Sequence, residues 1–471
     1  MRKAILASIV VLATVTGALG GPLRVREVPF PYRTIQEAID AANDGDTVIV
    51  HPGTYSGGGN RDIDFLGKAI TVRSEDPEEE GIVAATIIDC QASGESPHRA
   101  FIFQTSEDAN SIVAGFMILN AYIRVDGTPA PDTETPGGDG EDSMGGAIVC
   151  TGTSPIIRNC IINNCVAEGG KGGAGAPGQP GVPGDPGDPN DPNDDIDPIP
   201  PTPGGPGGNA GNGYGGGVYC DPNSAPTILN CQFNQCNAIG GTGGAGGTGG
   251  TPGDPNEPNA PQGPSGSSDS EAGGGGIYIA SGSTATITDC TFADCNAVGN
   301  GDAPSRGGGV FYGMSYSGKL VADIIGCVSG EGGGVYCDWG CDLAIAGCSI
   351  TEGRAAFGAN IYCDWNCVLE INDCSLNDGH ADFLGGGLCS APVSTVTITD
   401  TDILNNVADF YGGGIWFAGS TGSNGNLTLI NCDVSSNTSA GAGGGIFYEP
   451  GGSLTLQNCQ VTGNSSADGI G

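Results

Sequence analysis

The sequence predicts an all-β solenoid in which each repeat of the chain forms one coil and successive coils stack. Two observations support this fold class: a short motif of alternating apolar residues returns eleven times after residue 85, and runs of glycine before an apolar pair return between its copies. The motif recurs about every 26 or 27 residues where no insertion intervenes, as at Gly347, Asp373 and Asp400. One period is therefore one coil, and residues one period apart become neighbours in adjacent coils.

Each copy of the motif ends in a residue type that tolerates a left-handed backbone at low cost. The eleven aligned positions are Asp89, Gly115, Asn159, Asn230, Asp289, Gly326, Gly347, Asp373, Asp400, Asn431 and Asn458. An Ile, Leu or Val stands two residues earlier, as Ile371 does before Asp373, whereas the residue between them is unrestricted. This alternation predicts a strand with one buried face, a left-handed corner and a second strand.

The glycine runs predict a further tight corner in the coil, where backbones of adjacent coils approach closely. Each glycine costs conformational entropy, so their repeated use indicates a geometric need. The clearest runs occupy residues 215–219, 274–278, 332–336, 412–416 and 443–447.

Residues 1–20 are predicted to be a secretory signal peptide, because Arg2 and Lys3 precede an apolar run and a small-residue cleavage site ending at Gly20. The run is too short for a confident membrane span, and no later stretch approaches the ~20 apolar residues that a span needs. We expect an exported protein, secreted or at the cell surface, whose mature chain has no transmembrane span.

Residues 21–55 are predicted to be an N-terminal segment that contains a capping helix and the first strand. Thr34 and Glu37 have the spacing of a capping box, and a strand is expected at 47–50. The helix is amphipathic and is expected to cover the unpaired strand edges at this end of the solenoid. Residues 56–471 are predicted to form the coils.

Three low-complexity insertions interrupt the coils and are predicted to be disordered, because their Gly, Pro, Asp and Asn content offers nothing with which to build a core. They lie at about 126–143, 166–213 and 237–272. Residues 175–189 contain five collagen-like triplets. We expect a flexible or polyproline-like loop there; the alternative, a collagen triple helix, would require a trimer.

The chain is strongly acidic, with 15 basic and 53 acidic residues and a net charge of −38. This balance excludes nucleic acid as a partner and disfavours polyuronates unless cations bridge the like charges. An acidic stretch in the second insertion is a candidate for loose calcium binding, although it lacks the spacing of an EF-hand loop. Its carboxylates are Asp188, Asp191, Asp194 and Asp195. The alternative explanation for the charge is solubility.

Nineteen cysteines are present, and nine directly follow the left-handed corner, where strand alternation points them inward. We expect a largely reduced ladder of packed thiols, since free cysteine behaves as a small hydrophobe. Cys337 and Cys341 recur one coil later as Cys363 and Cys367. A disulfide between coils, such as Cys341 with Cys367, is predicted for this group, with a tetrahedral zinc site as the alternative.

Between these cysteines, Asp338 is expected to stack on Asp364 and Trp339 on Trp365. Indole faces beside carboxylates are suited to a carbohydrate, with calcium as a possible cofactor. The alternative is that the tryptophans only cover the corner.

A second group is predicted one coil turn away, where Arg354 aligns with His380, and Asp382 with Asp409. A column of aromatic residues accompanies it, and we expect that column to serve packing. Its members are Phe357, Phe383 and Phe410.

The motifs resemble those of right-handed parallel β-helix proteins, the architecture of pectate lyases, over roughly residues 34–471. The glycine and Asn-Cys-x-apolar elements are also similar to the repeats of bacterial polymorphic outer-membrane proteins, most closely at 145–148 and 233–236. The resemblance implies a right-handed parallel β-helix. It leaves the activity open, because the fold serves lyases, hydrolases, esterases, adhesins and non-enzymatic surface proteins.

Two functions are therefore predicted as alternatives. The first is a non-catalytic secreted or cell-surface protein that presents a binding face to an extracellular polysaccharide or a surface protein. The second is a calcium-dependent polysaccharide lyase or glycoside hydrolase with Asp338, Asp364 and His380 near its centre. The enzyme requires a basic residue and at least two carboxylates lining one groove, whereas the binding protein needs only an aromatic platform.

Overall fold

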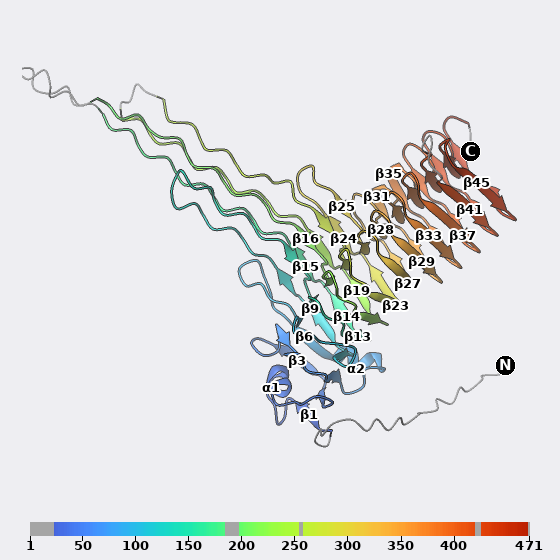
Figure 1. Cartoon of the computed structure of the whole chain (residues 1–471), viewed down its shortest axis with the longest axis horizontal. Helices are drawn as coiled ribbons and strands as arrows, with labels where there is room; N and C mark the ends of the chain where they lie inside the picture. The colour runs from blue at the N-terminus through green and yellow to red at the C-terminus, as the bar shows by residue number, and fades with distance from the viewer. Residues whose placement is uncertain (1–22, 184–196, 254–257, 420–424, 470–471) are drawn as a thin grey trace, which may run out of the picture.

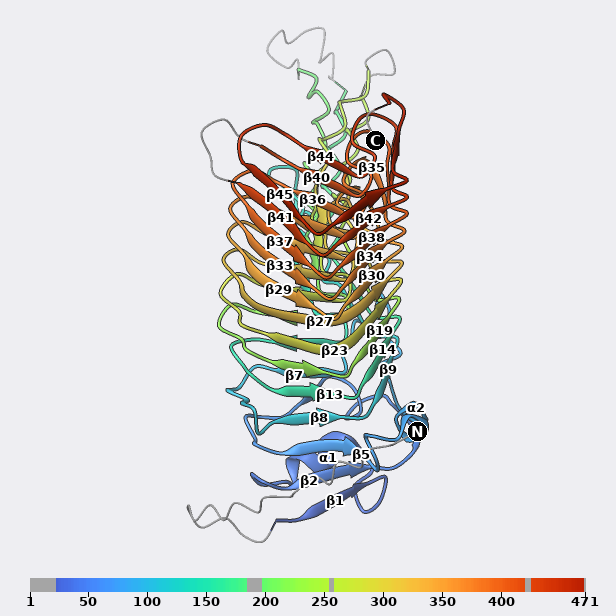
Figure 2. The same cartoon turned by 90° about the vertical axis from the view of Figure 1, so that its right-hand side faces the viewer.

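The computed structural model is a right-handed parallel β-helix from which a long arm projects (Figures 1 and 2). It describes residues 23–183, 197–253, 258–419 and 425–469. Every pairing between named strands is parallel and joins one coil to the next, as where Ile371 of β33 (Val368–Asn372) lies between Ile345 of β29 (Asp342–Ala346) and Ile398 of β37 (Thr395–Thr399). Residues one period apart are vertical neighbours, which confirms the predicted superposition.

The coils contribute strands to three faces. The largest face is a 23-stranded sheet that receives two strands per coil, such as β33 and β34 (Ser375–Asn377). An eleven-stranded sheet forms the second face. It contains β4 (Ile63–Asp64), β7 (Phe101–Phe103), β12 (Ile148–Cys150), β17 (Val218–Cys220), β22 (Ile277–Ile279), β26 (Val310–Tyr312), β28 (Val335–Cys337), β32 (Ile361–Cys363), β36 (Leu388–Ser390), β40 (Ile415–Phe417) and β44 (Ile446–Tyr448).

The third face consists of shorter sheets. In the C-terminal coils it is β31 (Arg354–Phe357), β35 (His380–Leu384), β39 (Val407–Ala408), β43 (Thr438–Ser439) and β47 (Ser465–Ser466). In the earlier coils two four-stranded sheets occupy it. These are β10 (Tyr122–Ile123), β15 (Val166–Glu168), β20 (Asn237–Ile239) and β24 (Asn296–Val298), and β11 (Ser143–Met144), β16 (Gly213–Tyr214), β21 (Ala272–Gly273) and β25 (Ser305–Arg306).

The corners follow the predicted columns with one exception. Ten of the eleven predicted left-handed residues have positive φ, for example Asp373 at 54°. Asp89 does not, because β6 (Thr86–Asp89) pairs with β9 (Met117–Leu119) and therefore belongs to the second strand of its coil. The corner after β6 is Gln91, at 48°.

A second left-handed column was missed in the sequence. It lies after the second strand of the coil, as at Asp378 with φ 55°, and it accepts Gln, Glu and Ser as well as Asn, Asp and Gly. Because so many residue types occur in this second column, the sequence pattern does not reveal it. The first glycine of each run supplies the third left-handed corner, as at Gly385 with φ 67°, which confirms the predicted role of the glycine runs.

The inside of the coils is one continuous apolar core that runs from Val28 to Val434. Ile, Leu, Val, Phe and Cys columns fill it, and Ile345, Ile371 and Ile398 are among its fully buried members. Stacked identical side chains remove apolar surface from water along the whole rod, which supplies most of its stability.

The N-terminal end differs in one respect from the prediction. Helix α1 (Ile35–Asp40) begins at Thr34, whose hydroxyl accepts a hydrogen bond from the Glu37 N–H at 3.2 Å. However, β1 (Val25–Val28) precedes the helix and pairs with β2 (Thr47–Val50), so the predicted first strand is the second. A second helix, α2 (Glu80–Ala85), packs beside β6. Neither helix of the described chain is long and apolar enough to cross a membrane.

The three insertions are not disordered where the structure describes them. They leave the third face as three long hairpins that lie side by side and form the arm, here defined as residues 125–142, 169–183, 197–212, 240–253 and 258–271 (Figure 1). The ends of each predicted insertion, such as β15 and β16, are strands of the coils.

Backbone hydrogen bonds between glycine-rich legs hold the arm together. Every third N–H of the second hairpin's outgoing leg donates to the third hairpin: Gly172 to the Thr242 carbonyl at 2.8 Å, and Gly175 to Ala245 at 2.8 Å. The intervening N–H of Gly173 donates instead to Gly138 of the first hairpin, at 2.7 Å. This period of three is that of polyproline II helices, here packed without an apolar core.

The collagen-like triplets take part in the same pattern. The N–H groups of Gly175, Gly178 and Gly181 all donate to carbonyls of the third hairpin of the same chain. The described part of this stretch therefore needs no second or third chain, and the triplet period serves an intramolecular bundle. The rest of the triplets, and the calcium candidates Asp188, Asp191, Asp194 and Asp195, lie outside the described residues.

Candidate functional site

The corner between the eleven-stranded sheet and the large sheet carries the predicted carboxylates and tryptophans. Asp338 and Trp339 follow β28, and Asp364 and Trp365 follow β32. Cys337 pairs in register with Cys363, and the Gly340 N–H donates to the Trp365 carbonyl at 3.0 Å, so the two turns lie one above the other. The spacing of one coil correctly predicted this superposition.

Both tryptophans face solvent: Trp339 is 51% exposed and Trp365 is 49% exposed. Large aromatic side chains normally bury most of their surface. Two of them half exposed on adjacent coils therefore form an unusual apolar patch on a solvent-exposed surface.

The two carboxylates are held differently. Asp338 accepts the N–H of Trp339, and Asp364 accepts the N–H of Trp365, each through Oδ1 at 2.8 Å. The second oxygen of Asp364 accepts the Tyr336 hydroxyl at 3.1 Å. Burial, and to a smaller extent the charge of Asp364, raise the pKa of Asp338 above its usual range, against the opposing effect of its backbone hydrogen bond.

A basic residue lies within electrostatic reach of this pair. Arg306 of β25 places its guanidinium carbon 5.4 Å from the centre of the Tyr336 ring, and its Nε lies 3.0 Å from the Glu331 carboxylate. The charge of Arg306 partly offsets the pKa increase of Asp338. The partners of Arg306, against the opposing effect of burial, raise the pKa of its guanidinium above the usual value. It is therefore a fixed positive charge.

The cysteines of this corner are free thiols, as are all nineteen cysteines of the chain. Cys341 and Cys367 point inward and donate to backbone carbonyls, Cys341 to Gly313 at 3.1 Å and Cys367 to Asp338 at 3.1 Å. In the structure both are free thiols that contact the backbone of the preceding coil, and the disulfide between Cys341 and Cys367 stays a prediction. Cys337 and Cys363 are free and buried as well, and burial raises the pKa of the Cys337 thiol.

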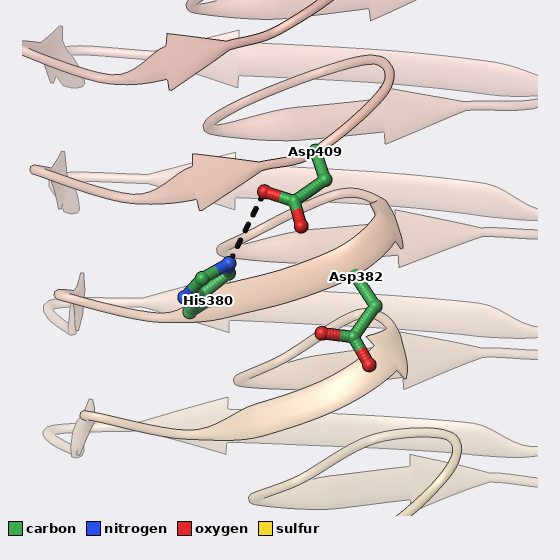
Figure 3. Close-up of side chains that lie close together, drawn as sticks. All are labelled: His380, Asp382 and Asp409. Atoms are coloured by element: carbon green, nitrogen blue, oxygen red, sulfur yellow. Dashed lines mark hydrogen bonds and ion pairs between the residues drawn. The ribbon is translucent and has the colours of Figure 1, made fainter.

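The third catalytic candidate, His380, does not belong to this corner. It lies on β35 in the third face, where its Nε2 is 3.2 Å from Oδ1 of Asp409, and Asp382 lies beside them (Figure 3). Arg354 pairs in register with His380, as predicted. Asp338 and Asp364 lie at the corner after β28 and β32, whereas His380 lies on β35 in the third face. The structure therefore does not bring the three residues to one centre, since alignment along the coil says nothing about which face a residue occupies.

The phenylalanine column next to His380 is not interior packing. The rings of Phe357, Phe383 and Phe410 stack at 5.3 and 5.4 Å, and the last two are 44% and 49% exposed. The inward positions of this face are instead filled by alanines such as Ala381 and Ala408. The alanines at the inward positions are visible in the sequence, and they indicate that the neighbouring phenylalanines point outward.

Comparison with known proteins supports the fold. Residues 321–470 match a family model described as "Right handed beta helix region". No curated protein matches the chain.

Solved structures similar to the chain include polysaccharide-acting enzymes. The catalytic domain of a GH87 alpha-1,3-glucanase in complex with nigerose is 11% identical over 96% of this chain and 67% of that chain, with a TM-score of 0.43. A PL6 alginate lyase in complex with a trisaccharide is 9% identical over 95% and 87%, with a TM-score of 0.37. The Family 28 exopolygalacturonase of Yersinia enterocolitica is 9% identical over 96% and 80%, with a TM-score of 0.26. At such scores these structures say nothing about the site.

Proposed function

We propose that the protein is an exported, non-catalytic β-helix protein that binds a polysaccharide at the corner of Trp339 and Trp365. The observation that carries the proposal is the pair of half-exposed indoles on adjacent coils, flanked by Asp338 and Asp364. Indole faces pack against the apolar faces of sugar rings, and the carboxylates accept hydrogen bonds from sugar hydroxyls.

The charge of the protein favours a neutral polysaccharide. With a net charge of −38, the surface repels polyuronates at long range. The stacking of coils contributes as well, because the two indoles are spaced by roughly 4.8 Å and present two neighbouring contacts to a polymer.

A hydrolase remains the second candidate, favoured by the raised pKa of Asp338 beside a second carboxylate. A carboxyl that keeps its proton to higher pH than usual is what general acid catalysis of glycoside cleavage requires. A lyase is less well supported, because Arg306 is bound to Glu331 with a raised pKa and is a poor base for proton abstraction.

The test is binding of the full chain to a panel of neutral and acidic polysaccharides by affinity electrophoresis, with new reducing ends scored in parallel. We expect retention by a neutral polymer that falls at least tenfold in Trp339→Ala and Trp365→Ala. Trp416→Ala, on the eleven-stranded sheet, is the matched control and should bind as the parent does. Unchanged binding in the first two variants would refute the proposal, and reducing ends that disappear in Asp338→Asn would establish the hydrolase instead.

A further inference from the structure

We propose that His380, Asp382 and Asp409 form a binding site for a divalent transition-metal ion of the Zn²⁺ class. The site lies on the third face and does not rest on the polysaccharide site at the tryptophan corner. One ligand atom from each residue lies within 4.8 Å of those of the other two. Figure 3 shows the three side chains close together on two adjacent coils, with His380 turned toward Asp409.

The backbone fixes these positions. His380 and Asp382 are both on β35, two residues apart, so they lie on the same outward face of the strand. Parallel pairing places Val407 above His380 and Ala408 above Ala381, and the Asp409 N–H donates to the Ala381 carbonyl at 3.0 Å. Asp409 is therefore held one coil above Asp382, and only side-chain rotations are needed to close the three groups on an ion.

An ion pair alone does not account for the cluster. His380 contacts Asp409, but Asp382 has no hydrogen-bond or ion-pair partner within the described chain. Two carboxylates stacked on adjacent coils repel each other, and a bound cation between them would remove that repulsion. His380 and Asp382 also line an open pocket of about 270 Å³ together with Arg354, so solvent and ions reach them.

The donor set selects the class of metal. Imidazole nitrogen disfavours calcium and magnesium, which prefer oxygen ligands throughout, and the two carboxylates disfavour the softest ions. One nitrogen and two oxygens suit Zn²⁺ and neighbouring divalent ions. Three protein ligands leave at least one coordination position open, as in zinc sites that bind water or a further ligand.

The experiment is calorimetric titration of the full chain with Zn²⁺ in excess calcium, which occupies unspecific carboxylate sites. The background carries Cys459→Ser, because Cys459 is the one cysteine that is not fully buried and its thiol would compete for the ion. We expect one site per chain, weakened at least tenfold in His380→Gln, Asp382→Asn and Asp409→Asn. Co²⁺ bound in place of Zn²⁺ should give an absorption spectrum that changes in His380→Gln.

The matched control is His51→Gln. His51 also lies 3.2 Å from a carboxylate, that of Glu75, but is not part of a cluster of three ligands. Its loss should leave Zn²⁺ affinity unchanged. The melting temperature of each metal-free variant shows whether it is folded. The proposal fails if no stoichiometric site is found, or if folded His380→Gln binds Zn²⁺ as tightly as the parent.

Discussion

The rod of coils and the arm are built from the same chain by opposite means. The rod alternates residues with a period of two and buries a continuous column of Ile, Leu, Val, Phe and Cys. The arm repeats with a period of three, and Ala176 is its only buried apolar residue beyond glycine in the described legs. The rod is thus stabilised by the hydrophobic effect, and the arm by backbone hydrogen bonds that only glycine allows to form.

Low-complexity composition therefore does not by itself imply disorder. A segment without apolar side chains cannot form a core, but glycine at every third position removes the side chains that would keep neighbouring backbones apart. A methyl group at Gly172 would overlap the carbonyl oxygen of Gly208, and one at Gly173 would overlap that of Thr128. The following changes are ordered from the largest expected effect to the smallest, and each tests this division between rod and arm.

A core truncation should destabilise the rod most. Ile371→Ala removes a fully buried side chain stacked between Ile345 and Ile398, and we expect a loss of about 2–5 kcal/mol. Urea unfolding followed by circular dichroism measures it. Glu370→Ala, exposed on the same strand, is the control and should shift the transition little. A similar loss in both variants would show that the column is not what holds the rod together.

The rod also contains a polar ladder that resembles the arm in relying on hydrogen bonds. Asn406 is fully buried; its Nδ2 donates to the Leu376 carbonyl at 2.8 Å and its Oδ1 accepts the Gly379 N–H at 2.9 Å. Asn406→Ala leaves both backbone groups without their partner, at a cost of about 1–3 kcal/mol. Asn372→Ala, on an exposed face, serves as the comparison in the same urea titration. Equal stability of the two variants would contradict the interpretation.

Gly172→Ala should loosen the arm and leave the rod intact. The added methyl group displaces the leg that contains Gly208, so hydrogen bonds on both sides of it weaken. Hydrogen–deuterium exchange with mass spectrometry should show faster exchange over the arm and unchanged exchange in β33 and β37. Lys171→Ala changes an exposed side chain of the same leg and should have no such effect. Faster exchange throughout the rod would mean that arm and rod unfold together.

The smallest effect concerns a partly buried charge on the rod, and it depends on pH. The folded state raises the pKa of Asp338, so the folded chain holds this proton more tightly than the unfolded chain does. Stability is therefore lost as pH rises from the unfolded pKa of about 3.9 through the folded pKa. Asp338→Asn should raise the melting temperature at pH 7 and leave it unchanged near pH 3, whereas Asp342→Asn, exposed on β29, should leave it unchanged at both pH values. A lower melting temperature for Asp338→Asn at pH 7 would mean that the ionised carboxylate of Asp338 stabilises the folded chain, contrary to its raised pKa.

Prediction from the sequence succeeded where the pattern has one physical cause. Corner residues such as Asp373 and core residues such as Ile371 follow from strand alternation and from the cost of a left-handed backbone, both of which act locally. It failed where two signals compete. Asp89 fits the corner pattern but is placed one strand later by pairing with Leu119, and the second corner column accepts residues as ordinary as Glu352.

The sequence by itself determined the coil, its period and the vertical neighbours Asp338 and Asp364, because stacking needs only equal spacing along the chain. The tertiary structure alone decided which face each column occupies, and so separated His380 from the tryptophan corner and brought it to Asp409. It also decided the fate of the insertions. Hydrogen bonds between legs that lie tens of residues apart cannot be read from one leg, since each glycine-rich segment is ordered only by the presence of the others.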